Sequence, residues 1–207
     1  MYNKVMDCYF FGTFNPIHLG HIEIARRVKE ILGFKKVIFV PSYMPPHKIE
    51  GLASFQDRIN MANLALGEEN VSDIEHNLRV PSYTYRTIEK LYEEKQERIN
   101  FIIGYDQFFM LESWREPDIL RQKTHFIVIP RKFQNGQVMG SKAFDYFRDK
   151  NWDFEVVKID FLDISSNMIR QYREKNMDIT GLTTLEVKNY IENNGLYSTV
   201  AKEKFVR

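Results

Sequence analysis

The chain alternates short apolar runs with longer segments in which apolar residues recur every three or four positions. The short runs are typical of buried strands, and the longer segments are typical of amphipathic helices. The predicted strands are residues 7–11, 36–40, 71–74, 99–103, 125–129 and 154–159. The predicted helices are residues 21–32, 55–66, 84–92, 167–174 and 185–193. This alternation indicates an α/β fold over residues 1–207 as a single domain: a Rossmann-like, doubly wound, mainly parallel sheet with helices on both faces.

The first predicted strand leads through residues 12–21, Gly-Thr-Phe-Asn-Pro-Ile-His-Leu-Gly-His, into the first predicted helix. A helix N-terminus exposes unpaired N–H groups and carries a partial positive charge, which makes it a natural phosphate site. His18 and His21 stand three residues apart at that terminus and add donors whose protonation is adjustable near neutral pH. The spacing alone leaves two alternatives open. Instead of a phosphate site, the histidines could be an exposed surface pair or metal ligands, but no cysteine and no carboxylate besides Glu23 lies nearby to complete a zinc set, which disfavours a metal.

The composition is that of an ordinary soluble globular protein, with 43% apolar and 28% charged residues. Lys and Arg number 29 against 28 Asp and Glu, which argues against an extended nucleic-acid surface but not against a local phosphate pocket. Cys8 is the one cysteine, so an intramolecular disulfide is excluded. Because no secretion signal and no apolar run of membrane-spanning length is apparent, we expect a cytoplasmic protein that does not contact a membrane.

Three segments with candidate chemistry each follow a predicted strand. They are residues 12–21, Gly104 and residues 164–170. In open α/β sheets, ligands bind beyond the carboxyl ends of the strands, at the point where the strand order reverses. We therefore expect the three segments to converge on one crevice, which is the predicted active site.

Two of these segments resemble the signature motifs of the nucleotidyltransferase superfamily, whose members transfer adenylyl or cytidylyl groups. Residues 12–21 are similar to its first motif, which ends in H-x-G-H. Residues 164–170, Ile-Ser-Ser-Asn-Met-Ile-Arg, are similar to its second motif, I-S-S-T-x-x-R. The two motifs stand in the expected order and at the expected distance, which is far more specific than either motif alone.

Further segments resemble one family of that superfamily, the nicotinate-nucleotide adenylyltransferases. They are Pro-Ser-Tyr-Met-Pro-Pro-His-Lys at residues 41–48, Pro-Ser-Tyr-Thr at 81–84, residues 101–106 with Trp114, and residues 190–197. Without the resemblance, a solvated turn is the favoured interpretation of residues 41–48, residues 81–84 are equally a helix cap, and a core position is an alternative for Trp114. The resemblance covers essentially the whole chain. It implies adenylyl transfer from ATP to nicotinate mononucleotide, giving deamido-NAD and pyrophosphate in NAD biosynthesis, with Mg²⁺ held by substrate phosphates and water.

The resemblance also implies roles for individual residues. The implied catalytic residues are His18, His21, Lys48 and Arg170. The implied ATP-binding residues are Gly12, Thr13, Phe14, His18, His21, Gly104, Asp106, Ile164, Ser165, Ser166 and Arg170. The implied acceptor-binding residues are Asn15, His47, Lys48, Tyr83, Thr84 and Trp114. In this assignment Lys48 bridges the phosphates of both substrates, Arg170 clamps the β,γ-phosphates and Trp114 stacks on the pyridine ring.

Some positions depart from the family pattern. Phe11 stands where the family usually has glycine, Asn15 where it has aspartate, and Asn167 where it has threonine. Asn15 keeps a hydrogen-bonding oxygen but loses the charge. Residues 131–150 and 179–183 are the least family-like segments.

Two other functions stay open. The acceptor could be nicotinamide mononucleotide, phosphopantetheine, FMN or phosphocholine, although residues 45–48, residues 82–84 and Trp114 favour nicotinate mononucleotide. The chain could also be a non-catalytic adenylate-binding module, but binding alone would not require both histidines, Lys48 and Arg170. We expect ATP and nicotinate mononucleotide as partners and no nucleic acid, and the sequence leaves open whether the protein is a homo-oligomer.

Overall fold

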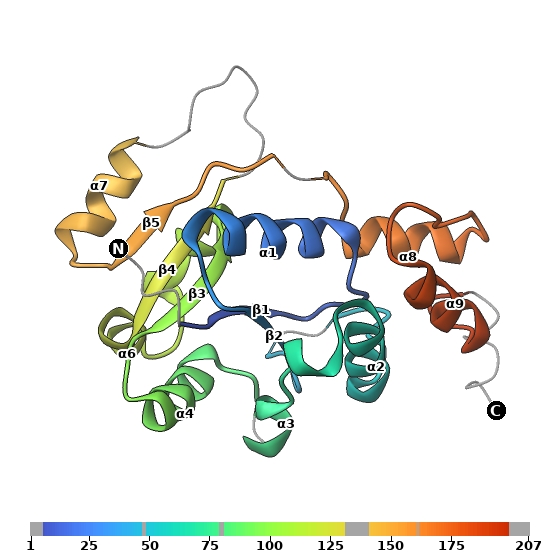
Figure 1. The fold of residues 1–207 in the computed structure, drawn as a ribbon, viewed down its shortest axis with the longest axis horizontal. Helices are drawn as coiled ribbons and strands as arrows, with labels where there is room; N and C mark the ends of the chain where they lie inside the picture. The colour runs from blue at the N-terminus through green and yellow to red at the C-terminus, as the bar shows by residue number, and fades with distance from the viewer. Residues whose placement is uncertain (1–5, 47–48, 79–80, 131–140, 161, 199–207) are drawn as a thin grey trace.

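Five parallel strands form one sheet in the order β2-β1-β3-β4-β5 (Figure 1). The computed structural model describes residues 6–46, 49–78, 81–130, 141–160 and 162–198. The strands are β1 Cys8–Gly12, β2 Val37–Pro41, β3 Ile99–Gly104, β4 Thr124–Ile129 and β5 Phe154–Val156. The chain passes from β2 across β1 to build β3, so the strand order reverses between β1 and β3. Ligands of open parallel sheets bind at such a point.

Helices connect the strands and cover both faces of the sheet. They are α1 Leu19–Leu32, α2 Phe55–Leu66, α3 Ile74–Leu78, α4 Thr84–Lys95, α5 Tyr105–Phe108, α6 Pro117–Lys123, α7 Ser141–Asp149, α8 Ser166–Glu174 and α9 Leu185–Asn193. Short 3₁₀ turns lie at Glu68–Asn70 and Leu111–Ser113. Across the described ranges, none of the helices combines the length and the apolar character that crossing a bilayer requires.

Side chains on β1 alternate between two hydrophobic cores. Cys8 and Phe10 face a core completed by buried residues of α1, α2, α8 and α9. Tyr9 and Phe11 face a second core completed by residues of α4, α6 and α7. Figure 1 shows α1 and α4 on opposite sides of the strands. The predicted doubly wound α/β fold is therefore confirmed, because a period of two sends successive strand residues to opposite, helix-covered faces.

The prediction of a strand at residues 71–74 is wrong. Val71 makes only an isolated bridge to Phe39, and α3 begins at Ile74. Ser72 Oγ accepts a hydrogen bond from Ile74 N at 3.3 Å, and Asp73 O accepts one from His76 N at 2.8 Å. A helical turn thus starts at these residues, and the bond from the Ser72 side chain to the nearby backbone outweighs the apolar character of Val71 and Ile74.

Several element boundaries differ from the predictions. The last strand ends at Val156 rather than at residue 159, although Val157 N still donates to Val128 O at 3.1 Å. The helix predicted at residues 84–92 continues to Lys95, where Gln96 ends it in a left-handed conformation with φ 55°. Four helices, α3, α5, α6 and α7, were not predicted. Two of them have only four and seven residues, too short for a helical period to stand out.

Candidate active site

The imidazole rings of His18 and His21 stack at the N-terminus of α1. Their centroids lie 3.5 Å apart and their planes make an angle of 26°. His18, at the N-cap position, donates its backbone N–H to Nδ1 of His21 at 3.3 Å. Because Nδ1 of His21 accepts this hydrogen bond, its neutral ring carries the proton on Nε2. The His21 ring therefore presents a donor on the side away from its own helix terminus.

Burial holds both histidines neutral. His18 is 5% exposed, and this burial lowers its pKa to about 4. Burial also lowers the pKa of His21, and the neighbouring His18 lowers it further because two cations would repel. Phe10 and Phe14 approach the His21 ring edge to face at 5.9 and 5.0 Å. Nδ1 of His18 is buried without a hydrogen-bond partner in the described chain, which is unusual for a polar atom and suits a ligand-binding site.

Two glycines allow the chain to pass close to these rings. A Cβ atom at Gly20 would lie 3.0 Å from Nδ1 of His18 and 3.0 Å from the carbonyl oxygen of Leu162. A Cβ atom at Gly12 would lie 2.9 Å from the ring of Phe14. The side chain of Phe14 is buried in the core, so any contact of Phe14 with ATP has to come from its backbone. The first motif thus requires glycine at both positions for steric reasons.

The second motif meets the first one directly. Ser166 Oγ donates to the carbonyl oxygen of Pro16 at 2.8 Å, and Arg170 Nη1 donates to the carbonyl oxygen of Asn15 at 2.8 Å. Arg170 Nη2 also donates to Asn167 Oδ1 at 3.2 Å. The two motifs are about 150 residues apart in the chain and form one surface.

The remaining residues of the second motif have structural partners. Ser165 is the N-cap of α8, and its Oγ accepts from Met168 N at 3.1 Å. Ile164 packs against the core on the α1 face of the sheet. Contacts of these residues with ATP stay predictions, and the cap fixes the direction in which the N-terminus of α8 points.

Asn15 joins three segments rather than standing free for a substrate. Its side chain is 2% exposed. Oδ1 accepts from Ala53 N at 3.0 Å and from the Tyr197 hydroxyl at 2.7 Å, while Nδ2 donates to the carbonyl oxygen of Gly51 at 3.1 Å. The amide supplies both a donor and an acceptor here, whereas an ionised aspartate could not donate to the carbonyl oxygen of Gly51. An acceptor contact of Asn15 stays a prediction.

The segments predicted to bind the acceptor lie side by side. Met44 N donates to Ser82 Oγ at 2.9 Å, and Ser82 N donates to the carbonyl oxygen of Met44 at 2.9 Å. Tyr83 is the N-cap of α4 and Thr84 its first residue. His47 and Lys48 lie outside the described residues.

Trp114 lies near the segment around Tyr83, because the residue that follows Trp114 contacts the Tyr83 ring. Its ring packs, partly buried, against the core beneath α4. The next residue, Arg115, places its guanidinium 4.3 Å from the centre of the Tyr83 ring, within cation–π distance. The geometry brings Trp114 and Tyr83 into one neighbourhood, while stacking on a pyridine ring stays a prediction.

Gly104 and Asp106 lie at the carboxyl end of β3, which pairs with β1. A Cβ atom at Gly104 would meet nothing within 4 Å, so no steric reason in the protein itself requires glycine there. Both residues are thus at the edge of the sheet where Gly12 ends β1, as predicted. Their contacts with adenosine stay predictions.

Two buried charged residues of the site, Arg58 and Glu75, were not among the predicted site residues. They are 1% and 4% exposed. A signal for Arg58 was present, because it falls on the apolar face of α2 with Phe55, Met61 and Ala62 at helical spacing. A charge on such a face is unusual and needs partners. Glu75 lies in a helix of five residues and gave no comparable pattern.

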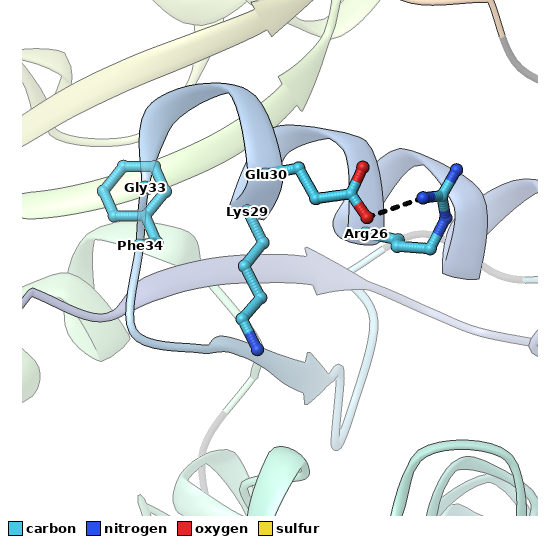
Figure 2. Close-up of a pocket in the computed structure, with 5 residues that line it drawn as sticks. All are labelled: Arg26, Lys29, Glu30, Gly33 and Phe34. Carbon is cyan, nitrogen blue, oxygen red and sulfur yellow. Dashed lines mark hydrogen bonds and ion pairs between the residues drawn. The ribbon is translucent and has the colours of Figure 1, made fainter. Parts of the chain in front are cut away.

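A cavity of about 1100 Å³ adjoins the junction of the two motifs. Arg170 and Asn167 line it together with residues 49–54 and 194–198. Its size is that of a small-ligand site. A smaller pocket of about 440 Å³ lies at the opposite end of α1, between Lys29, Gly33 and Phe34 (Figure 2). There Arg26 and Glu30 form an ion pair at 2.6 Å, and no group of the predicted site is present.

Known proteins resemble this chain in sequence and in fold. A family model described as cytidylyltransferase-like matches residues 9–172. The chain is 35% identical over 193 residues to the probable nicotinate-nucleotide adenylyltransferase of Carboxydothermus hydrogenoformans, covering 91% of this chain and 96% of the relative. It is 33% identical over 192 residues to that of Caldicellulosiruptor saccharolyticus, with the same coverage. The solved structure of Plasmodium falciparum nicotinic acid mononucleotide adenylyltransferase complexed with NaAD shares the fold, with TM-score 0.72 and 21% identity over 93% of this chain and 97% of the other.

Proposed function

The chain belongs to the cytidylyltransferase-like family and, within it, to the nicotinate-nucleotide adenylyltransferases, and on that premise we propose that it transfers the adenylyl group of ATP to nicotinate mononucleotide. The products are deamido-NAD and pyrophosphate, and the reaction is a step of NAD biosynthesis. The protein is thus a nucleotidyltransferase enzyme.

One structural observation supports this proposal above all. Ser166 and Arg170 of the second motif donate to the carbonyl oxygens of Pro16 and Asn15 in the first motif. The N-termini of α1 and α8 therefore flank one site, and each supplies backbone donors and a partial positive charge. Two helix termini beside two histidines and an arginine suit a substrate with several adjacent phosphates.

The reaction itself requires positioning and charge stabilisation. An oxygen of the acceptor's 5′-phosphate attacks the α-phosphorus of ATP, and the bond from the α-phosphorus to the oxygen that bridges it to the β-phosphorus breaks. Pyrophosphate leaves with that electron pair. His18 and His21 are neutral in the free protein and offer ring donors to the phosphate oxygens, on which charge builds up. Ser165, Ser166 and Arg170 hold the departing phosphates.

A divalent cation fits this site only when the substrates bring most of its ligands. Among the described residues no group of three or more His, Cys, Asp or Glu side chains is placed to hold a metal. Asn15, where the family usually has a carboxylate, uses its amide within the protein. We propose that Mg²⁺ binds to phosphate and water oxygens, where it neutralises part of the phosphate charge.

The test is pyrophosphate release by the purified protein with Mg²⁺, ATP and a panel of acceptors. The panel contains nicotinate mononucleotide, nicotinamide mononucleotide, phosphopantetheine, FMN and phosphocholine. We expect the highest kcat/KM with nicotinate mononucleotide. A higher value with a different acceptor would overturn the proposed substrate. ATP binding without turnover of any acceptor would indicate a non-catalytic module.

A further inference from the structure

Arg58 places a positive charge inside the protein. It lies on the inward face of α2 and is 1% exposed. Its hydrogen bonds all go to backbone carbonyl oxygens, and it forms no ion pair with a described residue. Burial lowers the pKa of Arg58, although an arginine stays charged at any physiological pH. Burying a charge is costly, and the nearby buried carboxyl group of Glu75 offsets only part of that cost, so this arrangement calls for a compensating role.

The four carbonyl oxygens come from three separate segments of the site. Arg58 Nη1 donates to Thr13 O at 2.9 Å and to Ser42 O at 2.6 Å. Nη2 donates to Tyr43 O at 3.4 Å, and Nε donates to Ala53 O at 3.2 Å. One rigid guanidinium thus joins the histidine motif, the loop after β2 and the segment that precedes α2. A planar group with donors in fixed directions sets the relative positions of the oxygens that it binds.

Glu75 also binds the loop after β2, at the backbone N–H of Tyr43. Its Oε2 accepts from Tyr43 N at 3.0 Å, and its Oε1 accepts from Thr87 Oγ1 at 3.1 Å. Arg58 therefore binds the carbonyl group of Tyr43, and Glu75 binds the amide group of the same residue. The next residue, Met44, donates its backbone N–H to Ser82 Oγ and accepts a hydrogen bond from Ser82 N at its carbonyl oxygen. A continuous chain of bonds runs from Thr13 to the start of α4.

We propose that Arg58 is a positioning residue for the transfer reaction. It aligns the ATP-binding turn at Thr13 with the acceptor-binding segments around Tyr43 and Ser82. This inference rests on the proposed function, because the two segments are taken to hold the two substrates. Transfer requires the acceptor oxygen and the α-phosphorus within about 3–3.5 Å, and a misplacement of about 1 Å costs on the order of 10²-fold in rate.

The decisive variant is Arg58→Met, which keeps an unbranched side chain of similar reach but removes every donor. We expect kcat to fall by about 100-fold while the Kd for ATP alone changes by less than about fivefold, because alignment of the two substrates suffers more than binding of one. Arg58→Lys should recover part of kcat, since an ammonium group reaches some of the four carbonyl oxygens but not all. Arg26→Met, on the exposed face of α1, is the matched control and should keep full activity.

A second readout separates positioning from folding. We expect a few millimolar guanidinium ion, far below denaturing concentration, to raise kcat of Arg58→Ala and to leave the control variant unchanged. Circular dichroism and the melting temperature establish that each variant is folded. A folded Arg58→Met with wild-type kinetics overturns the proposal. So does failure of every Arg58 variant to fold, Arg58→Lys included, because Arg58 is then a folding residue. The assay uses whichever acceptor the wild-type protein turns over, so a wrong acceptor assignment shows in the wild type first.

Discussion

The rings of His18 and His21 lie stacked with 3.5 Å between their centroids, and two hydrogen bonds, one from each backbone N–H, join the two residues. Two imidazolium ions at this distance would repel strongly, and burial already disfavours the first charge. The pair therefore takes up protons only at a pH well below neutrality, or when an anion arrives. If a triphosphate binds here, as proposed, we expect nucleotide binding to be coupled to proton uptake.

The first prediction concerns stability against pH. The pKa of His18 is about 4 in the folded protein and near 6.5 when the chain is unfolded. Between these values the unfolded chain binds more protons, so the free energy of unfolding decreases as the pH falls from about 6.5 to about 4. The difference corresponds to roughly 3 kcal/mol when the whole window is crossed. We expect urea denaturation to show a smaller loss over this range for His18→Gln than for the wild type. Equal losses would mean that His18 does not titrate as its burial implies.

The second prediction concerns catalysis by the histidines. His18→Ala and His21→Ala should each lower kcat by about 10²-fold or more, because donors to the developing charge act mainly in the transition state. His125→Ala is the control, since His125 lies near the start of β4, away from the carboxyl ends of the strands, and bonds to Asp153 at 2.8 Å. Steady-state kinetics with both substrates decide the matter. Near-normal turnover in both site variants would remove the histidines from the mechanism.

The third prediction concerns Arg170. Arg170→Lys keeps the charge but loses the planar fork that bonds to Asn15 and Asn167. We expect kcat/KM for ATP to fall by about tenfold or more, with little change in the melting temperature. Arg173→Lys is the matched control, because Arg173 lies about one helix turn from Arg170 and donates to Glu192 on α9. This variant should behave like the wild type. Unchanged kinetics in Arg170→Lys would place Arg170 outside the phosphate site.

The sequence predicted the convergence of the two motifs for a sound reason. Both follow parallel strands, and carboxyl ends of parallel strands meet at one edge of a sheet. It did not predict what binds the loops together. Arg58 acts through backbone carbonyl oxygens of Thr13, Ser42, Tyr43 and Ala53, and backbone atoms have no sequence signature. Only its position on an apolar helix face marked it as unusual.

The role of Asn15 illustrates a related limit. Family resemblance predicted a contact with the acceptor, whereas the structure gives its amide three partners within the protein. One of them, Tyr197, is 182 residues away in the chain. Such a tertiary partner follows from the packing of the C-terminal segment, which local patterns do not describe. The strand at residues 71–74 was wrongly predicted for the opposite reason, because here local contacts decide the structure. Hydrogen bonds at Ser72 and Asp73 to residues two or three positions further on start a helix where the apolar pattern indicated a strand.

The last prediction concerns the choice of acceptor. The N-terminus of α4 at Thr84 has no side-chain cap, and the guanidinium of Arg115 lies 4.3 Å from the Tyr83 ring centre. Donors and positive charge favour the carboxylate of nicotinate, whereas the amide of nicotinamide would direct its own donor at them. We expect kcat/KM for nicotinate mononucleotide to exceed that for the amide form by at least about tenfold. Trp114→Ala should lower kcat/KM for both acceptors alike, and Trp114→Phe should recover part of it, because stacking does not distinguish carboxylate from amide. An equal or reversed preference in side-by-side assays would show that this pocket does not select for negative charge, and unaltered kinetics in Trp114→Ala would make Trp114 a core residue only.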